Sequence, residues 1–593
     1  MNEQNTTIVK PNAEARDVDE LFAGKIFRVP NYQRNYAWNE KNWEDFWNDI
    51  REGLETGTEH YWGTITLKAT NETYSCEEED KYFKVYEVVD GQQRLTTIYL
   101  FLLALSNNGK YILKRRFIKC GDIYRLELGG LNHQFLKDLV DEKDPTPTIE
   151  TNKLLKGCLE YFENQIKSFG RLDELSRYLQ KITFSLEFVV QDQTLAVKAF
   201  ESLNDRGKPL TLLDKTKSYL MFISLRYLKN NDLNETINKV FGNVFINYDV
   251  IKEIGEQENI DYIKSARFTE DELLRFFYHY FAWYAIRQYE LQDIGYDYDA
   301  TANDVFEIFL KESCSYLKNS PKLEEFITEF LNELDKFVLS FRKIMEKVKI
   351  DCKIRKLFCF LGLNTRVYPL IISLEAENLL DDYMLNLLET LDIRVYKIKG
   401  TDPRANLYRD VISKIKVNPD CQKIVNGGKD DRGNNLWGIR DFINHFMNDS
   451  LFHYYLNGDM YDSPAVKYIL WEYERYVHPD SFDDCDYELY KKCQIEHIFP
   501  EEPTVNFPTH NFDDINEYFS NIHKLGNLCL LEESINKKIK NKTPQKKSKY
   551  YQKSQIPRTR QLGYNIHNKG LNKDDIRQLT RSIIVFCLKR WKI

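Results

Sequence analysis

The chain has 593 residues and a mass of 70.7 kDa, which is too long for one hydrophobic core and predicts two to four domains, most simply three. Its 42% hydrophobic and 29% charged residues exclude a disordered or fibrous chain. The most apolar stretch, Leu273 to Ile286, is shorter than the ~20 residues of a membrane span. A net charge of −8 excludes a general nucleic-acid coat, so nucleic acid would have to contact local basic patches.

The cysteine pattern and the first residues both predict the same cellular compartment, the cytoplasm. Eleven cysteines are scattered without a CxxC pair, which argues against a disulfide framework and against a structural zinc site. The first residues contain no basic-then-apolar signal segment. We therefore expect a cytoplasmic protein that does not contact a membrane.

The first 225 residues predict a domain that mixes strands and helices. Residues 1–20 are polar and predict a flexible arm. Apolar residues recur at i, i+3, i+4 and i+7 from Trp43 to Ile50 and predict a helix capped by Asn39 or Asn42. Further on we expect strands over 61–67 and 83–89, an exposed acidic loop over 77–80, and helices over 95–105, over 195–203 and from 211 onward.

The remainder of the chain predicts a helical middle and a separate C-terminal domain. From about residue 226 to 425 the pattern is almost wholly helical, and the glycine-rich loop over 426–434 predicts a boundary. The fold class is therefore α+β and multidomain. We expect a flexible arm (1–20), a mixed α/β domain (21–225), a helical connector (226–428) and a C-terminal domain (429–593).

The segment Asp90–Arg94 lies between a predicted strand and a predicted helix. Gly91 lets the backbone approach a ligand closely, and the helix start offers N–H groups and a positive dipole end to an anion. Arg94 can bind a phosphate with two nitrogens, and Asp90 can hold a metal ion or orient water. The same strand–turn–helix geometry also occurs without a ligand, so this segment alone leaves both readings open.

A second candidate is the aromatic segment Val29–Trp38. Its aromatic side chains alternate with Gln33 and Arg34, residue types that stack on bases and bond to phosphates or base edges. The alternative is a loop rich in tyrosine and tryptophan that covers a core.

The strongest cluster of polar residues lies near the C-terminus. Ile495–Pro500 predicts a short strand that contains Glu496 and His497, and residues 526–531 predict a second strand. A hairpin followed by a helix can bring four side chains to one divalent ion: Glu496, His497, Asn527 and Asn536.

Each of these residue types suits phosphodiester cleavage. His497 is neutral near pH 7 and can remove a proton from water. Mg²⁺ prefers oxygen ligands, here the Glu496 carboxylate and the Asn536 amide, and it neutralises charge on the reacting phosphate. Asn527 would fix the hairpin and the orientation of His497.

A basic run follows this cluster. Between Ser534 and Arg560 the chain has ten cationic residues and no acid, which predicts either a phosphate-binding surface or a plain solvated face. Of the other histidines, His523 stays undecided because it lies four residues before Asn527. Structural roles are expected for the rest: His60, His133, His279, His445, His453, His478, His510 and His567.

Both ends of the chain resemble one family. Three segments are similar to the ParB-like N-terminal domain of GmrSD-type, modification-dependent (type IV) restriction enzymes: Val29–Trp38, Asp90–Thr96 and Phe200–Leu210. Three others resemble that family's C-terminal HNH nuclease domain, a ββα-metal motif: Ile495–Pro500, Gly526–Leu531 and Asn541–Tyr550. The resemblance covers roughly 20–225 and 430–593, and the middle is similar to the family's helical connector.

In the N-terminal part, the resemblance implies a nucleotide site and a sensor. The implied nucleotide-binding residues are Asp90, Gly91, Gln92, Gln93, Arg94, Asn204 and Arg206, with Asp90 also acting in hydrolysis. The spacing from Gly91 to Arg94 is also similar to the phosphate loop of ParB-type CTP switches. Tyr32, Gln33 and Arg34 correspond to a segment implicated in sensing modified DNA.

In the C-terminal part, the resemblance assigns catalytic and DNA-contacting roles. His497 corresponds to the general base, Asn527 to the middle motif position and Asn536 to the last metal-side position, with Asn541 as the alternative. The implied DNA contacts are Lys542, Lys546 and Lys547. Thr543-Pro544 stands where the family often has Pro-Phe, so the phosphate contact is assigned to Lys546 or to Lys547.

We therefore predict a phage-defence endonuclease that recognises modified foreign DNA. It would bind and hydrolyse GTP, CTP, UTP or ATP, and would cut or nick DNA with Mg²⁺ or Mn²⁺, as a possible homodimer. Two alternatives stay open: a nucleotide-dependent ParB-like DNA-binding regulator without cleavage, and an RNA-cutting toxin that works without metal.

Overall fold

A computed structural model describes most of the chain: residues 13–30, 35–77, 80–129, 131–147, 150–181, 183–190, 211–228, 230–291, 293–417, 419–429, 435–502 and 510–593. It divides into two compact units, one of Met1–Glu253 with Ala302–Val338 and one of Ile254–Thr301 with Leu339–Ile593. The boundary expected at 428/429 lies inside the second unit. Over the described residues, every helix is too short or too polar to cross a membrane.

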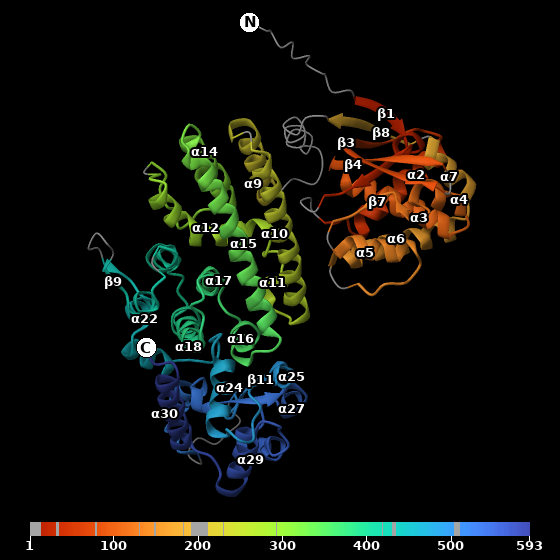
Figure 1. Ribbon diagram of the computed structural model, residues 1–593. Coiled ribbons are helices and arrows are strands. Elements are labelled where there is room, and N and C mark those ends of the chain that lie inside the picture. The colour runs from red at the N-terminus through yellow and green to blue at the C-terminus, as the bar shows by residue number, and fades with distance from the viewer. Residues whose placement is uncertain are drawn as a thin grey trace. The chain divides into compact units, whose positions relative to one another are not determined.

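The first unit contains a six-stranded mixed sheet in the order β1-β8-β3-β4-β2-β7 (Figure 1). Its strands are β1 (Ala13–Asp17), β2 (Lys25–Arg28), β3 (His60–Cys76), β4 (Lys81–Asp90), β7 (Leu126–Glu127) and β8 (Thr183–Val190). β3 and β4 form an antiparallel hairpin, while β3 with β8 and β2 with β4 are parallel pairs. The expected strands over 61–67 and 83–89 are confirmed as parts of β3 and β4.

Helices cover the sheet and bury the larger of its two apolar clusters. They include α1 (Val18–Phe22), α2 (Glu40–Thr56), α3 (Gln92–Asn107), α5 (Leu131–Val140), α6 (Glu150–Phe169) and α7 (Leu172–Lys181). The apolar stripe of α2 packs inward, where Phe46 stacks on Trp62 at 4.3 Å between ring centroids. Every residue of α3 from Leu95 to Ser106 is buried, because this helix is apolar on all sides.

Two further sequence expectations concern this unit. The helix expected from residue 211 is confirmed as α9 (Leu212–Ile223), and Thr211 and Asp214 form its capping box. The helix expected over 195–203 lies outside the described residues. After α9 follow α10 (Asn231–Gln257), α14 (Lys311–Leu317) and α15 (Lys322–Val348).

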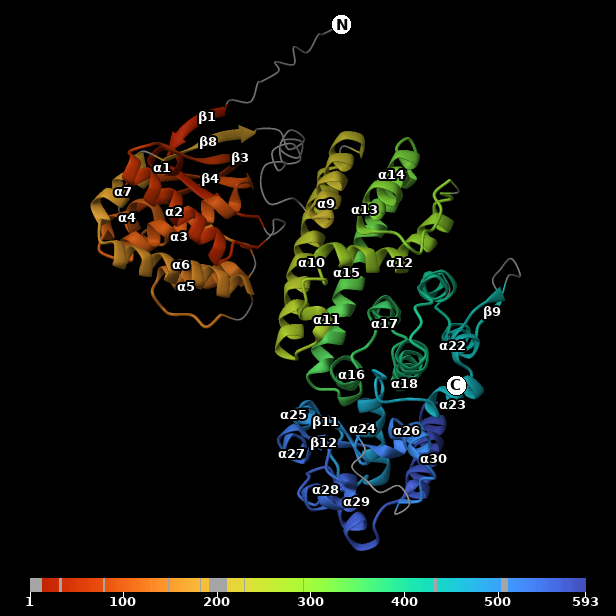
Figure 2. The ribbon, with the colours of Figure 1, turned by 180° about the vertical axis from the view of Figure 1, so that it is seen from behind.

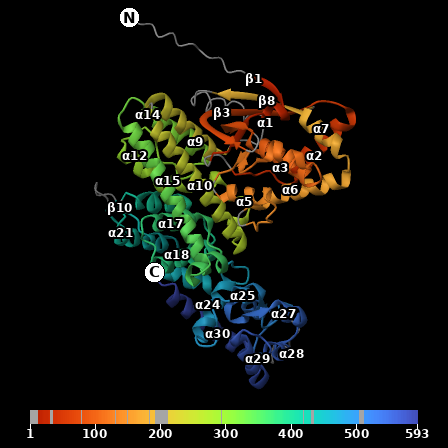
Figure 3. The same cartoon turned by 45° about the vertical axis from the view of Figure 1, so that its right-hand side comes forward.

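The second unit consists mostly of helices, which Figure 3 labels, and its C-terminal part also contains a small strand pair. Its principal elements are α12 (Glu270–Gln288), α16 (Cys352–Arg355), α17 (Tyr368–Ala376), α18 (Asp382–Leu391), α22 (Ile439–Met447), α23 (Asp449–Leu456), α24 (Val466–Val477), α25 (Tyr487–Lys492), β11 (Cys493–His497), α26 (Ile515–Ile522), β12 (Leu528–Glu532), α27 (Glu533–Ile539), α28 (Pro544–Tyr551), α29 (Pro557–Lys569) and α30 (Lys573–Arg590). The almost wholly helical character expected from 226 to 425 is confirmed in the described residues.

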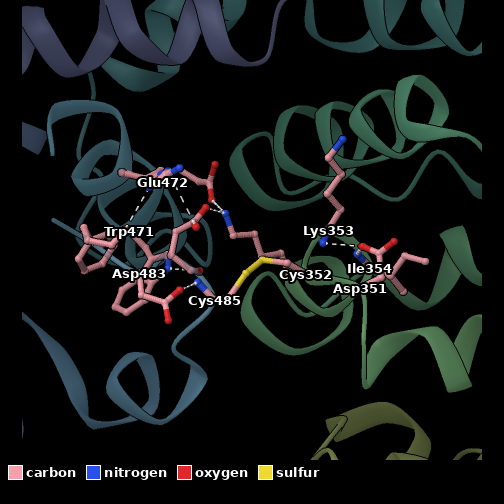
Figure 4. The surroundings of a disulfide bond; sticks show 12 residues. Asp351, Cys352, Lys353, Ile354, Trp471, Glu472, Asp483 and Cys485 are labelled. Atoms are coloured by element: carbon pink, nitrogen blue, oxygen red, sulfur yellow. Dashed lines mark hydrogen bonds and ion pairs between the residues drawn. A yellow bond between two sulfur atoms is a disulfide. The ribbon is translucent and has the colours of Figure 1, made fainter. Parts of the chain in front are cut away.

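One disulfide is present, whereas the sequence argued only against a disulfide framework. Cys352 and Cys485 are bonded, with 5.9 Å between their Cα atoms, and the other nine cysteines are free (Figure 4). Beside the bond, the buried ammonium of Lys356 pairs with Glu472 at 2.7 Å and with Asp484. The partners are 133 residues apart, so no local spacing in the sequence could have indicated this pair.

Candidate functional site

The hairpin of β11 and β12 positions the C-terminal candidate residues. The two strands are antiparallel, with Glu496 opposite Cys529 and His497 opposite Leu528. α27 follows β12 directly, and α27, α28 and α29 lie beside the hairpin (Figure 2). The described residues therefore form the strand–strand–helix order expected from the sequence.

Asn527 is a buried clamp at the start of β12. Its side-chain oxygen accepts the Phe499 N–H at 2.8 Å, and its amide nitrogen donates to the carbonyls of Phe499 (3.1 Å) and Ile522 (2.7 Å). Its backbone carbonyl accepts the Ile498 N–H at 2.8 Å. These bonds fix the chain directly after His497.

Glu496 is buried in an ion pair. Its carboxylate accepts hydrogen bonds from Lys547 Nζ at 2.5 Å and from the Tyr551 hydroxyl at 3.2 Å, and both donors belong to α28. Lys547 is 1% exposed and also donates to the His497 carbonyl, so its ammonium faces the hairpin and not a phosphate in solvent. Burial raises the pKa of Glu496, and the charge of Lys547 opposes that rise.

His497 contacts a different group of residues. Its Nε2 lies 3.0 Å from Nδ1 of His523, and the Tyr461 ring lies 4.2 Å from its own ring. Burial, together with the neighbouring His523 and Lys547, lowers the pKa of His497 to about 4, while Asp459 acts in the opposite direction. The imidazole is therefore neutral at pH 7, as a general base requires.

The remaining C-terminal candidates lie nearer the surface. Asn536 is half-buried and donates to the side chain of Gln494 at 3.1 Å, and the exposed Asn541 donates to Glu502 at 2.7 Å. Lys542 lies over the Tyr550 ring, and Lys546 is exposed. Of the three lysines, Lys546 is the most accessible to a phosphate.

The expected metal ligands do not form one donor group in this structure. Glu496 is bonded to Lys547 and Tyr551, and Asn536 is bonded to Gln494. In the part of the chain that the structure describes, one group has three His, Cys, Asp or Glu donors within 4.8 Å: Cys352, Asp484 and Cys485. The residues as arranged therefore do not fit a divalent ion at Glu496.

In the first unit, Asp90–Arg94 has the strand–turn–helix geometry expected. Asp90 ends β4, Gly91 has φ = 87°, and α3 starts at Gln92. Arg94 donates to Asp90 at 3.3 Å and to the Trp62 carbonyl at 3.3 Å. Burial raises the pKa of Asp90, and the positive charge of Arg94 opposes this rise. A Cβ on Gly91 would lie 3.0 Å from the Thr64 carbonyl oxygen, so a residue with a side chain would be crowded at this position.

Gln93 joins this turn to the aromatic segment. Its side-chain oxygen accepts the Ala37 N–H at 2.8 Å, and its amide nitrogen donates to the Asn35 carbonyl at 3.0 Å. The buried Tyr36 hydroxyl lies 2.8 Å from the Thr97 hydroxyl on the next turn of α3. The two candidate segments of the first unit are therefore bonded to each other.

Five candidate residues lie outside the described residues. They are Tyr32, Gln33, Arg34, Asn204 and Arg206. Their proposed roles remain predictions.

Comparison with known families decides the affiliation of the chain. The model of the GmrSD restriction endonuclease N-terminal domain matches residues 18–221, and that of the C-terminal domain matches residues 441–585. The chain belongs to the GmrSD restriction endonuclease family. Its N-terminal GmrSD domain contains Asp90–Arg94, and its C-terminal GmrSD domain contains the β11–β12 hairpin. No curated protein matches the chain.

Membership of the GmrSD family makes this protein a nuclease with DNA as its substrate class. The sequence did not reveal two features of its C-terminal domain: the contact of His523 and Tyr461 with His497, and the ion pair of Lys547. A signal existed for the second, because adjacent residues of a strand point to opposite faces. This period indicates that Glu496 and His497 face different neighbours, whereas the sequence analysis expected both at one ion.

Proposed function

We propose that the protein is a phage-defence endonuclease that cleaves or nicks DNA at an HNH-type site with His497 as its general base. The observation that carries this proposal is the neutral, buried His497 imidazole beside the Asn527 clamp on a hairpin of the GmrSD C-terminal domain. The exposed Lys546, together with Lys542, would bind the DNA phosphates.

In the proposed reaction, His497 accepts a proton from a water molecule as the water oxygen bonds to phosphorus. The bond between phosphorus and one ester oxygen then breaks, and that oxygen takes a proton from solvent. Asn527 holds the backbone after His497 and so fixes the position of the imidazole.

We also propose that cleavage requires Mg²⁺ or Mn²⁺, although Glu496 and Asn536, the ligands expected from the sequence, do not form a site for the ion as they are arranged in this structure. When bound, such an ion would neutralise charge on the reacting phosphate. At Glu496 such an ion would have to displace Lys547, because that carboxylate is already paired.

For the N-terminal domain we propose a ParB-like fold that binds and hydrolyses a nucleoside triphosphate. Gly91 and the first turn of α3 would approach the phosphates, Arg94 would bind them and Asp90 would orient water. Tyr32, Gln33 and Arg34 would sense the modified DNA. The bonds from Gln93 to Asn35 and Ala37 support a link between these two roles.

The test combines purified protein, Mg²⁺, each of four triphosphates, and phage DNA with or without modified bases. His497→Ala should abolish cleavage and leave triphosphate hydrolysis intact, whereas Arg94→Ala should lose triphosphate binding or hydrolysis. Cleavage that survives His497→Ala contradicts the catalytic assignment. Triphosphate turnover without cleavage of any DNA favours a ParB-like regulator instead.

A further inference from the structure

His523 is the second imidazole of the C-terminal site, and none of the chemistry proposed so far uses it. It lies 26 residues after His497, at the end of α26, and is half-buried. Its Nδ1 lies 3.0 Å from His497 Nε2, which is a hydrogen-bond distance. Because a hydrogen bond needs a proton, one of these two nitrogens donates and the other accepts.

The direction of this bond decides whether His497 can be a base. If His523 donated, His497 Nε2 would be occupied as acceptor, and a neutral His497 would carry its own proton on Nδ1. Neither nitrogen could then take a proton from water. If His497 Nε2–H donates to His523 Nδ1, the Nδ1 lone pair of His497 remains available.

The surroundings hold the two rings in this arrangement. The His523 carbonyl accepts the Met460 N–H at 3.0 Å, and Lys524 donates to the Asn457 carbonyl. These bonds attach the 457–461 segment, whose Tyr461 ring lies 4.2 Å from the His497 ring and 5.4 Å from the His523 ring. The carbonyl of Ile522, one residue before His523, accepts from Asn527, so the clamp that fixes His497 also fixes His523.

We propose that His523 is a positioning residue for the general base. Its Nδ1 accepts the Nε2–H of His497, which selects the tautomer of His497 that is basic at Nδ1 and fixes the plane of that ring. When His497 takes the proton from water, its Nε2–H remains bonded to His523, so the imidazolium keeps its partner. This inference rests on the proposed role of His497.

The experiment uses the full chain with single substitutions at His523. His523→Ala removes the acceptor, whereas His523→Asn places an oxygen near the position of Nδ1. His567→Ala is the matched control, because His567 is an exposed histidine on α29 of the same unit. Cleavage is measured under single turnover over a range of DNA concentrations, and thermal unfolding monitors the fold.

We expect His523→Ala to lower the maximal cleavage rate roughly 10- to 100-fold with the DNA concentration at half-saturation unchanged, as for loss of an orienting partner. His523→Asn should recover most of that rate, and His567→Ala should match the wild type. A folded His523→Ala protein with wild-type rate overturns the inference. So does a change confined to half-saturation, or an Asn variant as slow as the Ala variant.

A failure of the proposed function is separate from a failure of this inference. If the wild type cleaves no DNA under any condition, the nuclease proposal fails. If the wild type cleaves, His497→Ala does not and His523→Ala does so normally, only the role of His523 is wrong.

Discussion

Glu474 in α24 shows how burial sets the charge of a single residue. Its side chain is fully buried and accepts the Arg558 N–H at 3.0 Å. Burial raises the pKa of Glu474 to about 7, although the Arg558 charge opposes the rise. Between pH 4.5 and 7 the unfolded chain therefore loses this proton before the folded protein does. Stability falls over that window, by about 3 kcal/mol at most.

Glu474→Gln should remove this loss of stability, because glutamine does not ionise and keeps an acceptor for the Arg558 N–H. We expect the variant to melt above the wild type at pH 8 and to match it near pH 4.5. Differential scanning fluorimetry across this range checks the prediction, with the exposed Glu312→Gln as control. A melting difference that does not grow with pH would contradict it.

The Lys547–Glu496 pair makes a second prediction about individual side chains. Lys547→Met leaves a buried carboxylate without its cation, which should cost about 3–5 kcal/mol. Adding Glu496→Gln removes the unpaired charge and should restore part of that loss. Urea unfolding of the two variants measures both effects. If the double variant is no more stable than Lys547→Met, the pair does not determine stability here.

Helix α3 makes a prediction about the link between two segments. Gln93 accepts the Ala37 N–H and donates to the Asn35 carbonyl, so it holds the chain that follows the proposed sensor residues. Gln93→Ala should release that chain and speed hydrogen exchange at the Ala37 amide. Gln92→Ala, the neighbouring position, is the control and should leave this amide protected. Equal exchange in the two variants would show that the link does not hold the segment.

The secondary structure was predictable where its signal is local. The helix with the stripe from Trp43 to Ile50 and the helix start at residue 211 each depend on residues within two helical turns, and both predictions are confirmed. Strand β8 (Thr183–Val190) was not predicted from the sequence. It lies between β1 and β3 in the sheet. Its parallel pairing with β3 joins residues more than a hundred positions apart, and no local pattern specifies such a partner.

The candidate site was predictable to a similar extent. The sequence indicated the hairpin, the Asn527 clamp and the position of His497 beside them. It could not place His523 against His497, because the two histidines are 26 positions apart and no local pattern specifies their contact. The assumption that Glu496 and His497 face one ion neglected the two-residue period of a strand.

The whole second unit depends on contacts between distant parts of the chain. Arg394 donates to the Trp591 carbonyl at 2.8 Å, and the Trp591 ring N–H donates to Glu389 at 2.8 Å. These bonds join the helices after residue 380 to the end of α30 within one unit. The boundary expected at 428/429 lies within this unit.

The disulfide leads to a prediction about the stability of this unit. A bond between Cys352 and Cys485 closes a loop of 133 residues. By lowering the entropy of the unfolded chain, such a bond should stabilise the folded protein by about 5 kcal/mol. Dithiothreitol should therefore lower the melting temperature of the oxidised wild type. It should have no such effect on Cys485→Ser, whose melting temperature should equal that of the reduced wild type. A wild type indifferent to the reductant would show that the bond does not form in solution.

Strand β1 has a practical consequence for anyone who truncates this protein. It pairs antiparallel with β8, from Ala13 opposite Phe188 to Asp17 opposite Phe184, and so covers one edge of the sheet. A fragment begun at Val18, where the family match starts, would lack β1 and expose the backbone N–H and C=O groups of β8. An uncovered strand edge recruits other chains, so such a fragment would form aggregates during purification.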